Sequence, residues 1–399
     1  MNMPASEIEN APDYKAGTSD SNPPVSRFSS RRFAIFLSVI LTVLMGANWF
    51  VWATWNHFWN SPGTVAWTFI LPALSITFIA SMFLGWRYSG IWLRLMYRVS
   101  ATGMGVLNFA FFAAGAAWII SWAAALLSLH IEPKLFAGAF AGTAVLAALY
   151  GLVNASRLRV TRVTVKLANL PAMWDGRSAA LVTDMHLGNV RGAGFTRRVV
   201  ERLEQLRPEA VFISGDMFDG VKADFDALVE PWKRLSAPAG IYFVCGNHEE
   251  FDDRTKFVDA VMGAGIRVLN NEKVEVNGMQ IVGIHDGETD DPRLFRSLLQ
   301  RADLDRSCAS ILLAHRPVPW PDLSAVGMAG KLQGNALLRG NGKVPRWLAA
   351  RVHGKFNHGL NRFGGMQVFT SYGAGTWGVP MRVCTKSEIV LIRLEKGTP

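Results

Sequence analysis

The strongest constraint in the sequence is a long segment, residues 33–153, that is nearly free of charge. Four apolar stretches lie in it, at about residues 33–55, 64–86, 103–129 and 135–153. Each is close to or above the roughly 20 residues that a helix needs to cross a bilayer core. The pattern predicts a four-helix transmembrane domain over residues 31–156, after a disordered cytoplasmic tail over residues 1–30.

Charge around these stretches predicts their orientation. Basic residues precede the first helix, lie between the second and third, and follow the fourth, whereas the alternate loops hold only Lys134 as a firmly basic residue. By the positive-inside rule, both termini and the remaining chain are expected in the cytoplasm, with the helices in the cell (inner) membrane. None of the stretches contains Asp, Glu, Lys, Arg or His, which favours an anchor over a transporter.

Residues 157–399 have the composition of an ordinary globular domain, and strand-like segments alternate with helical ones. This predicts an α/β fold. Cys245 lies in the apolar run Ile241–Cys245, so we expect a reduced thiol in the core. The net charge of +10 is explained by residues flanking the apolar segments, and no nucleic-acid motif is present, so no nucleic-acid partner is expected.

Polar side chains follow four of the predicted strands, at the edge where α/β sheets bind ligands. They occur in the sequences D-x-H, G-D-x-x-D and G-N-H-E and in a later strand-end histidine. Carboxylates and imidazoles suit divalent ions such as Mn, Fe or Zn, and a bridging carboxylate can hold two of them. The residues concerned are Asp184, His186, Asp216, Asn247, His248 and His315.

These motifs, in this order, resemble those of the calcineurin-like metallophosphoesterases. The likeness covers residues 160–320 and resumes at about 353–394, where the tail is similar to that of the membrane-anchored bacterial branch. The resemblance implies a β-sandwich of two sheets covered by helices on both sides. It also implies two divalent metal ions that activate a water for attack on a phosphoester.

Carried over by residue, the resemblance assigns a role to each motif. Asp184 and His186 would hold the first metal, Asp216 would bridge the two, and Asn247 and His315 would hold the second. His248 would be catalytic, facing the phosphate and stabilising charge or protonating the leaving oxygen. Asp219 is expected to support the turn after Asp216 and not to bind metal, and Glu249 and Glu250 are expected to cap or orient the loop around His248.

The sequence departs from the family at one motif. The family has a G-H-x-H after the last strand-end histidine, but no histidine lies between His315 and His353. Residues 327–344 are expected to be a loop. Three explanations stay open: five ligands suffice, the site is a degenerate binding module, or this stretch has drifted. Weak oxygen ligands (Gln333, Asn335 or Asn341) or imidazoles (His353 and His358) are further candidates, although the two histidines are expected at the surface.

Other histidines have simpler interpretations. His57 and His130 are expected in the external loops, and the acidic segment 285–291 is expected to be a solvated loop after a strand. The leading hypothesis is therefore a membrane-anchored, metal-dependent phosphoesterase, and its anchor favours a lipid-linked phosphoester as substrate. The alternative is a catalytically degenerate membrane protein that acts as a binding or scaffold module.

Overall fold

The computed structural model describes residues 30–59, 65–130, 132–250, 253–288, 292–305, 307–316, 330–333, 358–363 and 366–397. The predicted disordered tail thus lies almost wholly outside the described residues. By its contacts the chain divides into residues 1–44 and residues 45–399. The first unit contributes the start of helix α1 to the described residues, and all other elements belong to the second.

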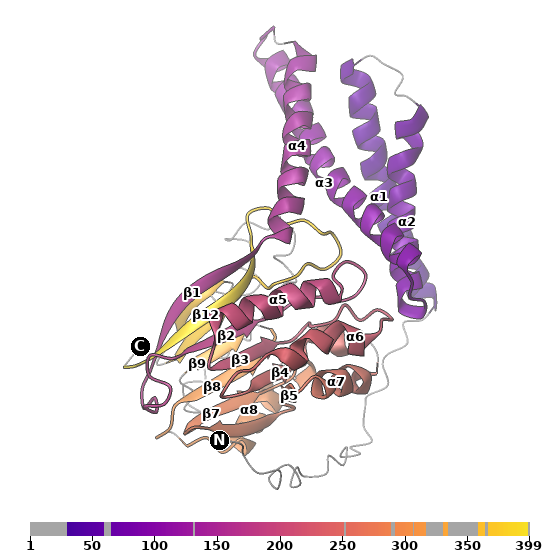
Figure 1. Ribbon diagram of the computed structural model, residues 1–399. Helices are drawn as coiled ribbons and strands as arrows, with labels where there is room; N and C mark the ends of the chain where they lie inside the picture. The colour runs from indigo at the N-terminus through magenta and orange to yellow at the C-terminus, as the bar shows by residue number, and fades with distance from the viewer. Residues whose placement is uncertain are drawn as a thin grey trace. The chain divides into compact units, whose positions relative to one another are not determined.

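Four long helices form the apolar part of the chain (Figure 1): α1 (Ser30–Trp59), α2 (Val65–Arg87), α3 (Ile91–Leu126) and α4 (Pro133–Ser156). All four are long and apolar enough to cross a membrane. Polar side chains pair between them, as Trp118 Nε1 donates to Thr54 Oγ1 at 2.9 Å and Asn48 Nδ2 to Ser75 Oγ at 3.0 Å. Such pairs satisfy polar groups that lipid cannot hydrogen-bond.

Two boundaries differ from the sequence prediction. Helix α3 begins at Ile91, well before residue 103, so Arg94 and Arg98 lie on its first turns with exposed side chains. Arginine is a good helix former, and a helix can continue past the apolar stretch into a polar region. The predicted external loop position of His57 is also wrong, since it lies in the last turn of α1 and stacks on Trp118, with ring centroids 4.6 Å apart.

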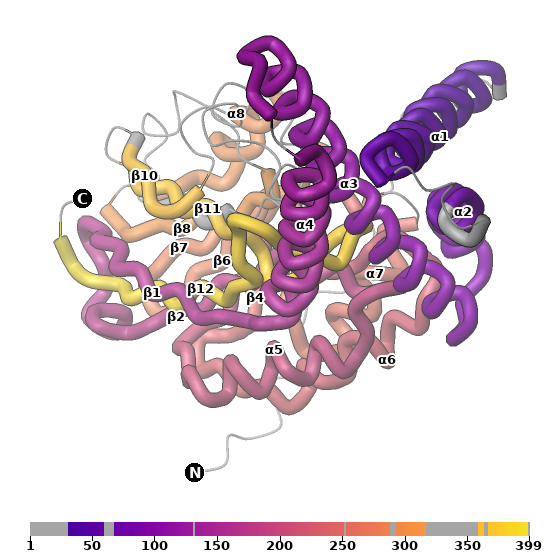
Figure 2. The backbone as a smooth tube through the Cα atoms, turned by 90° about the horizontal axis from the view of Figure 1, so that it is seen from above, coloured from indigo at the N-terminus to yellow at the C-terminus, as the bar shows by residue number. Residues whose placement is uncertain are grey.

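The rest of the chain forms two six-stranded sheets. The first has the order β1-β12-β2-β3-β4-β5, and Figure 2 shows β1, β12 and β2 side by side. The second has the order β10-β11-β9-β8-β7-β6. Strands β2 to β5 are mutually parallel, as are β7, β8, β9 and β11. The bounds are β1 Leu158–Leu167, β2 Ser178–Val182, β3 Ala210–Ser214, β4 Ile241–Val244, β5 Arg267–Val268, β6 Glu272–Val276, β7 Met279–Gly283, β8 Ser310–Ala314, β9 Gly330–Gln333, β10 Gly359–Phe363, β11 Met366–Thr370 and β12 Ser387–Lys396.

Helices cover the outer faces of both sheets (Figure 1). Helices α5 (Ala193–Leu206), α6 (Phe225–Val229) and α7 (Arg254–Gly263) share a core with the first sheet, and α8 (Pro292–Arg301) shares one with the second. A third core lies between the sheets, where Phe212 and Val244 meet Ile311 and Leu313. The predicted β-sandwich flanked by helices is confirmed. Cys245 is a buried free thiol in the first core, also as predicted.

A strand lies within residues 327–344, where the family has its G-H-x-H motif. Residues 330–333 form β9, which pairs in parallel with β8 and with β11, so the prediction of a loop over 327–344 is wrong there. Backbone pairing on both sides outweighs a composition rich in glycine and asparagine, because a central strand satisfies its amide groups whatever its side chains. Asn335, Asn341 and His353 lie outside the described residues.

The chain between β11 and β12 packs against α3 and α4. A Cβ built on Gly105 would lie 2.6 Å from Met381 Sδ, and one built on Gly151 would lie 3.2 Å from Met381 Cβ, so both helices present glycine where Met381 approaches. Asn154, at the end of α4, donates from Nδ2 to the carbonyl oxygens of Arg382 (2.9 Å) and Thr385 (2.7 Å). The end of α4 is therefore tied to this segment.

Candidate metal centre

Five predicted site residues come from the carboxyl ends of four strands. Asp184 and His186 follow β2, Asp216 follows β3, His248 lies in the 3-10 turn η2 (Asn247–Glu250) after β4, and His315 follows β8. All five are at most 3% exposed. Parallel strands place their carboxyl ends at one edge, so residues distant in sequence meet there.

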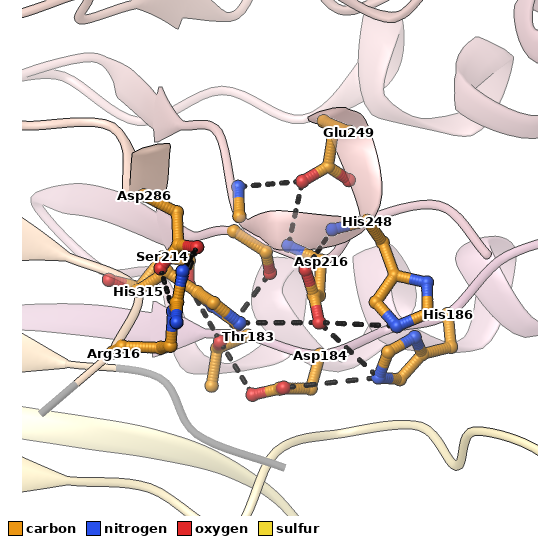
Figure 3. Close-up of polar contacts among 12 residues, drawn as sticks. Thr183, Asp184, His186, Ser214, Asp216, His248, Glu249, Asp286, His315 and Arg316 are labelled. Atoms are coloured by element: carbon orange, nitrogen blue, oxygen red, sulfur yellow. Dashed lines mark hydrogen bonds and ion pairs between the residues drawn. The ribbon is translucent and has the colours of Figure 1, made fainter. Parts of the chain in front are cut away.

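Asp216 lies at the centre of the group (Figure 3). Its Oδ2 atom is 3.2 Å from His315 Nε2, 3.8 Å from His186 Nε2 and 3.9 Å from His248 Nε2. His186 Nε2 also lies 3.9 Å from Asp184 Oδ1. The atoms form two possible metal-binding groups that share Asp216, namely His186–Asp216–His248 and Asp184–Asp216–His315. A shared carboxylate is the arrangement that a two-metal site requires.

Unpaired buried atoms in this cluster fit a cation. Asp184 Oδ1 and His186 Nε2 are buried and have no hydrogen-bond partner among the described residues. An unpaired buried carboxylate oxygen is costly unless a cation or donor reaches it. Oxygen and imidazole nitrogen also suit divalent transition metals, so the residues present fit the metals that the resemblance implies.

Electrostatics within the cluster show what a cation would replace. Burial disfavours a charged Asp216, but His315, His186 and His248 beside it hold its pKa below the usual range. Burial also disfavours a charged His315, yet Asp216 raises the pKa of that imidazole well above its usual value. The protonated form of His315 is thus stabilised beside Asp216, and a bound metal ion would displace that proton.

Neighbouring groups orient the imidazoles. Asp219 Oδ1 lies 3.4 Å from His186 Nδ1, the Asp219 carbonyl oxygen lies 3.2 Å from His248 Nδ1, and the Ser214 carbonyl oxygen lies 2.8 Å from His315 Nδ1. When Nδ1 donates to an oxygen, the Nε2 lone pair is left for a metal. Asp219 thus contacts two imidazoles and belongs to neither metal-binding group found among the described residues.

Glu249 holds the two loops of the site together. This fully buried side chain accepts from the backbone N–H groups of Asp216 (3.0 Å), Phe218 (3.0 Å) and Gly246 (2.7 Å). Burial, and then the charge of Asp216, raises the pKa of Glu249 to about 7. The predicted orienting role of Glu249 is confirmed by these bonds.

His248 and Asn247 differ in how closely they approach the cluster. The Nε2 atom of His248 is as near to Asp216 as that of His186, so the geometry makes His248 a possible metal ligand as well as a group facing substrate. Burial lowers the pKa of His248 and so favours its neutral imidazole. A neutral imidazole can bind a metal ion or accept a hydrogen bond. Asn247 is partly exposed, and its side chain makes no hydrogen bond to another described residue.

The backbone of the site adopts unusual conformations. Asp184, His186 and Asp216 have positive φ values of 53°, 47° and 50°. Gly373, with φ of 80°, follows β11 and packs so closely on Asp184 that an added Cβ would lie 2.7 Å from Asp184 Cβ. Positive φ at non-glycine residues is costly and clusters at functional sites. No sequence pattern used above predicts it.

The acidic segment after β7 begins with two buried residues, so the prediction of a solvated loop is wrong at His285 and Asp286. Asp286 is fully buried and accepts two hydrogen bonds from Arg316 Nε, at 2.6 and 2.8 Å. His285 is 7% exposed and lies 3.0 Å from Glu250 Oε1. The opposite charge of Arg316 makes this burial tolerable, and charge counting along a loop could not reveal that partner.

His358 is partly exposed and stacks on Tyr372, with ring centroids 3.6 Å apart.

Sequence reasoning missed Trp377. Its ring lies edge-on to His248, with centroids 5.3 Å apart, and is 46% exposed. A large exposed aromatic ring beside a polar centre offers apolar contact to a ligand. The tail segment that contains it carried part of the resemblance, but no local signal separated Trp377 from its neighbours.

Residues 178–351 match the family model described as calcineurin-like phosphoesterase. The chain is 30% identical over 279 residues to "Transmembrane protein with metallophosphoesterase domain" of Danio rerio, which covers 64% of this chain and 61% of the relative. It is 28% identical over 225 residues to "Uncharacterized metallophosphoesterase" of Helicobacter pylori, with 54% and 58% covered. A relative of the same name in Aquifex aeolicus is 28% identical over 265 residues, with 63% and 97% covered.

The chain spans about three fifths of the length of the first two of these relatives. The family match covers strands β2 to β9 and every predicted ligand, and the apolar helices agree with relatives named as transmembrane proteins. Residues 178–351 thus form a calcineurin-like metallophosphoesterase domain, and four helices that are long and apolar enough to cross a membrane precede it.

Proposed function

We propose that this protein is an active hydrolase that cleaves a phosphoester at a two-metal centre. The observation that carries the proposal is Asp216 Oδ2, which is shared by two groups of buried donors. Asp184, His186, Asp216, Asn247 and His315 would hold the ions, and His248 would face the phosphate. Two divalent ions of the Mn, Fe or Zn type would supply an activated water and positive charge opposite the phosphate.

The protein's own residues would prepare the site for this reaction. The Ser214 carbonyl oxygen would fix the tautomer of His315, Asp219 lies beside His186 Nδ1, and Glu249 holds the loops that carry Asp216 and His248. His248 would contact the phosphate or donate a proton to the leaving oxygen. The alternative, a binding module without hydrolysis, rests on the missing G-H-x-H.

We further propose that the substrate is a lipid-linked phosphoester at the cytoplasmic face of the inner membrane. The exposed ring of Trp377 beside His248 supports an apolar substrate, and the segment that carries Trp377 continues to Met381 against α3 and α4. An apolar chain leaving the membrane near these helices would find an aromatic contact next to the phosphate site.

Replacing Trp377 with alanine tests the substrate. We expect kcat/KM for a lipid phosphate presented in vesicles to fall about tenfold, as for the loss of one large apolar contact. We expect kcat/KM for p-nitrophenyl phosphate to stay within about twofold, because that substrate has no lipid chain. Met173, an exposed apolar residue outside the site, gives the control variant Met173→Ala. Equal losses on both substrates, or much faster wild-type turnover of soluble substrates, would contradict a lipid-linked substrate.

A native cysteine tests the orientation. Cys384 is exposed and lies in the segment between β11 and β12, whereas Cys245 is buried. With both termini in the cytoplasm, a membrane-impermeant maleimide should label inverted membrane vesicles and spare intact spheroplasts. Cys384→Ser should remove most of the label. Labelling of intact spheroplasts at Cys384 would reverse the proposed orientation.

A further inference from the structure

A second charged pocket lies away from the metal centre, between the start of α3 and the start of α5. It is open, has a volume of about 390 Å³, and is lined by Arg98, Arg191, Gly192, Gly194, Phe195 and Arg198 among others. We call it the arginine pocket. Arg98, Arg191 and Arg198 form no ion pair with any carboxylate among the described residues, so three guanidinium groups surround one space without a counter-ion.

Arg191 is the central group of the arginine pocket. It is 9% exposed, and its Nη2 donates to the Ala155 carbonyl oxygen at 2.7 Å. Its Nε is buried and has no hydrogen-bond partner among the described residues. Burial, and then the charges of Arg198, Arg382 and Arg98, lowers its pKa to about 10. A buried donor among like charges is stabilised by an anion.

The other two arginines are positioned by neutral groups. Arg98 Nε donates to the Asn189 carbonyl oxygen at 3.0 Å. The guanidinium carbons of Arg191 and Arg198 lie 4.7 and 5.6 Å from the centroid of the Phe195 ring. These contacts hold the cations in place and leave their charge uncompensated.

The backbone adds donors at the same place. Helix α5 has Gly192 as its N-cap, and no side chain caps it. The N–H groups of Phe195 and Thr196 both approach the Gly192 carbonyl oxygen, and those of Ala193 and Gly194 have no acceptor among the described residues. A Cβ built on Gly192 or Gly194 would meet nothing within 4 Å, so the helix end is open. Free amides at a helix N-terminus favour an anion.

We propose that the arginine pocket binds a phosphate group, which an anionic lipid headgroup or free phosphate can supply. Arginine forks and helix N-terminal amides match the oxygen atoms of phosphate in geometry and charge. The lipid source is favoured because Arg98 belongs to α3, a helix apolar enough to span the membrane. The site is distinct from the metal centre, since none of the metal-binding residues lines it.

The test uses the detergent-purified full-length chain, treated with EDTA so that phosphate cannot bind through metal. Native mass spectrometry would detect retained phosphatidylglycerol, with phosphatidylcholine as the neutral comparison, and calorimetry would measure binding of inorganic phosphate. The variants are Arg198→Gln and Arg98→Gln, both at exposed positions, which avoids the folding risk of replacing buried Arg191. Arg197→Gln is the matched control, because Arg197 is exposed, adjacent in sequence and outside the pocket lining.

We expect the wild type to retain phosphatidylglycerol over phosphatidylcholine, and each pocket variant to weaken anion binding about fivefold. Arg197→Gln should leave it unchanged. Retention of phosphatidylglycerol without binding of inorganic phosphate would identify the headgroup as the source, whereas binding of both would show that the phosphate group suffices. If the wild type binds neither, or if Arg197→Gln weakens binding as much as Arg198→Gln, the proposal is overturned. Neither readout depends on hydrolysis.

Discussion

Replacing Asp216 with alanine is expected to lower phosphoester hydrolysis by about a thousandfold or more, since charge stabilisation at the reacting centre is lost. Its Oδ2 is the atom that both groups of metal donors share, at 3.2 Å from His315 Nε2 and 3.8 Å from His186 Nε2. Without this oxygen the two groups of metal ligands no longer share a carboxylate. Elemental analysis should find about two divalent ions per wild-type chain and at most one in the variant.

Asp226→Ala is the matched control for this experiment. Asp226 is an exposed carboxylate in the first turn of α6, on the segment that follows β3, and it takes no part in either metal-binding group. Normal metal content and full activity in Asp216→Ala would refute the shared-carboxylate centre. A wild type that holds two ions but hydrolyses no phosphoester would instead favour the degenerate binding module.

Glu249→Ala is expected to destabilise the domain by about 3 kcal/mol or more, because three buried N–H groups lose their acceptor. The three belong to Asp216, Phe218 and Gly246, all on loops that carry the site. We expect metal affinity to fall about tenfold or more as well, the usual result of removing a group that orients ligands. Thermal denaturation and metal titration of the purified chain measure the two effects.

The neighbouring glutamate provides the comparison. Glu250 accepts from Gly287 N–H at 2.8 Å and lies 3.0 Å from His285 Nδ1, but its side chain is 29% exposed. Water can therefore replace some of the hydrogen bonds that Glu250→Ala removes. The effect of this substitution on metal affinity should be small. Glu249→Gln keeps an acceptor oxygen and should fall between the wild type and Glu249→Ala. Metal affinity equal to wild type in Glu249→Ala would show that the loops need no such support.

The apolar helices and the polar strand ends could be predicted because their signals are local. A run of apolar residues indicates a spanning helix by its length alone, and a carboxylate or imidazole directly after a buried strand indicates a ligand at the sheet edge. Helix α3 shows the limit of such reasoning. Its first turns, with Arg94 and Arg98, lie beyond the apolar stretch, so hydropathy placed the start of the helix too late.

Errors in the prediction arose where a partner distant in sequence decides the outcome. Asp286 was expected in water and is buried against Arg316, and residues 330–333 were expected in a loop but pair between β8 and β11. The composition of each segment gives no sign of the distant residue or strands that it contacts. For the same reason it did not reveal Trp377 beside His248.

The sequence by itself determined the residue types at the metal centre and the strands they follow, because both depend on short-range patterns. Only the tertiary structure decided that Asp216 stands between His186, His248 and His315, and that Glu249 bonds both loops. It also decided that Arg98 from α3 meets Arg191 and Arg198 around one pocket. The physical reason is that these distances are fixed by parallel strand pairing and by packing between elements far apart in the chain.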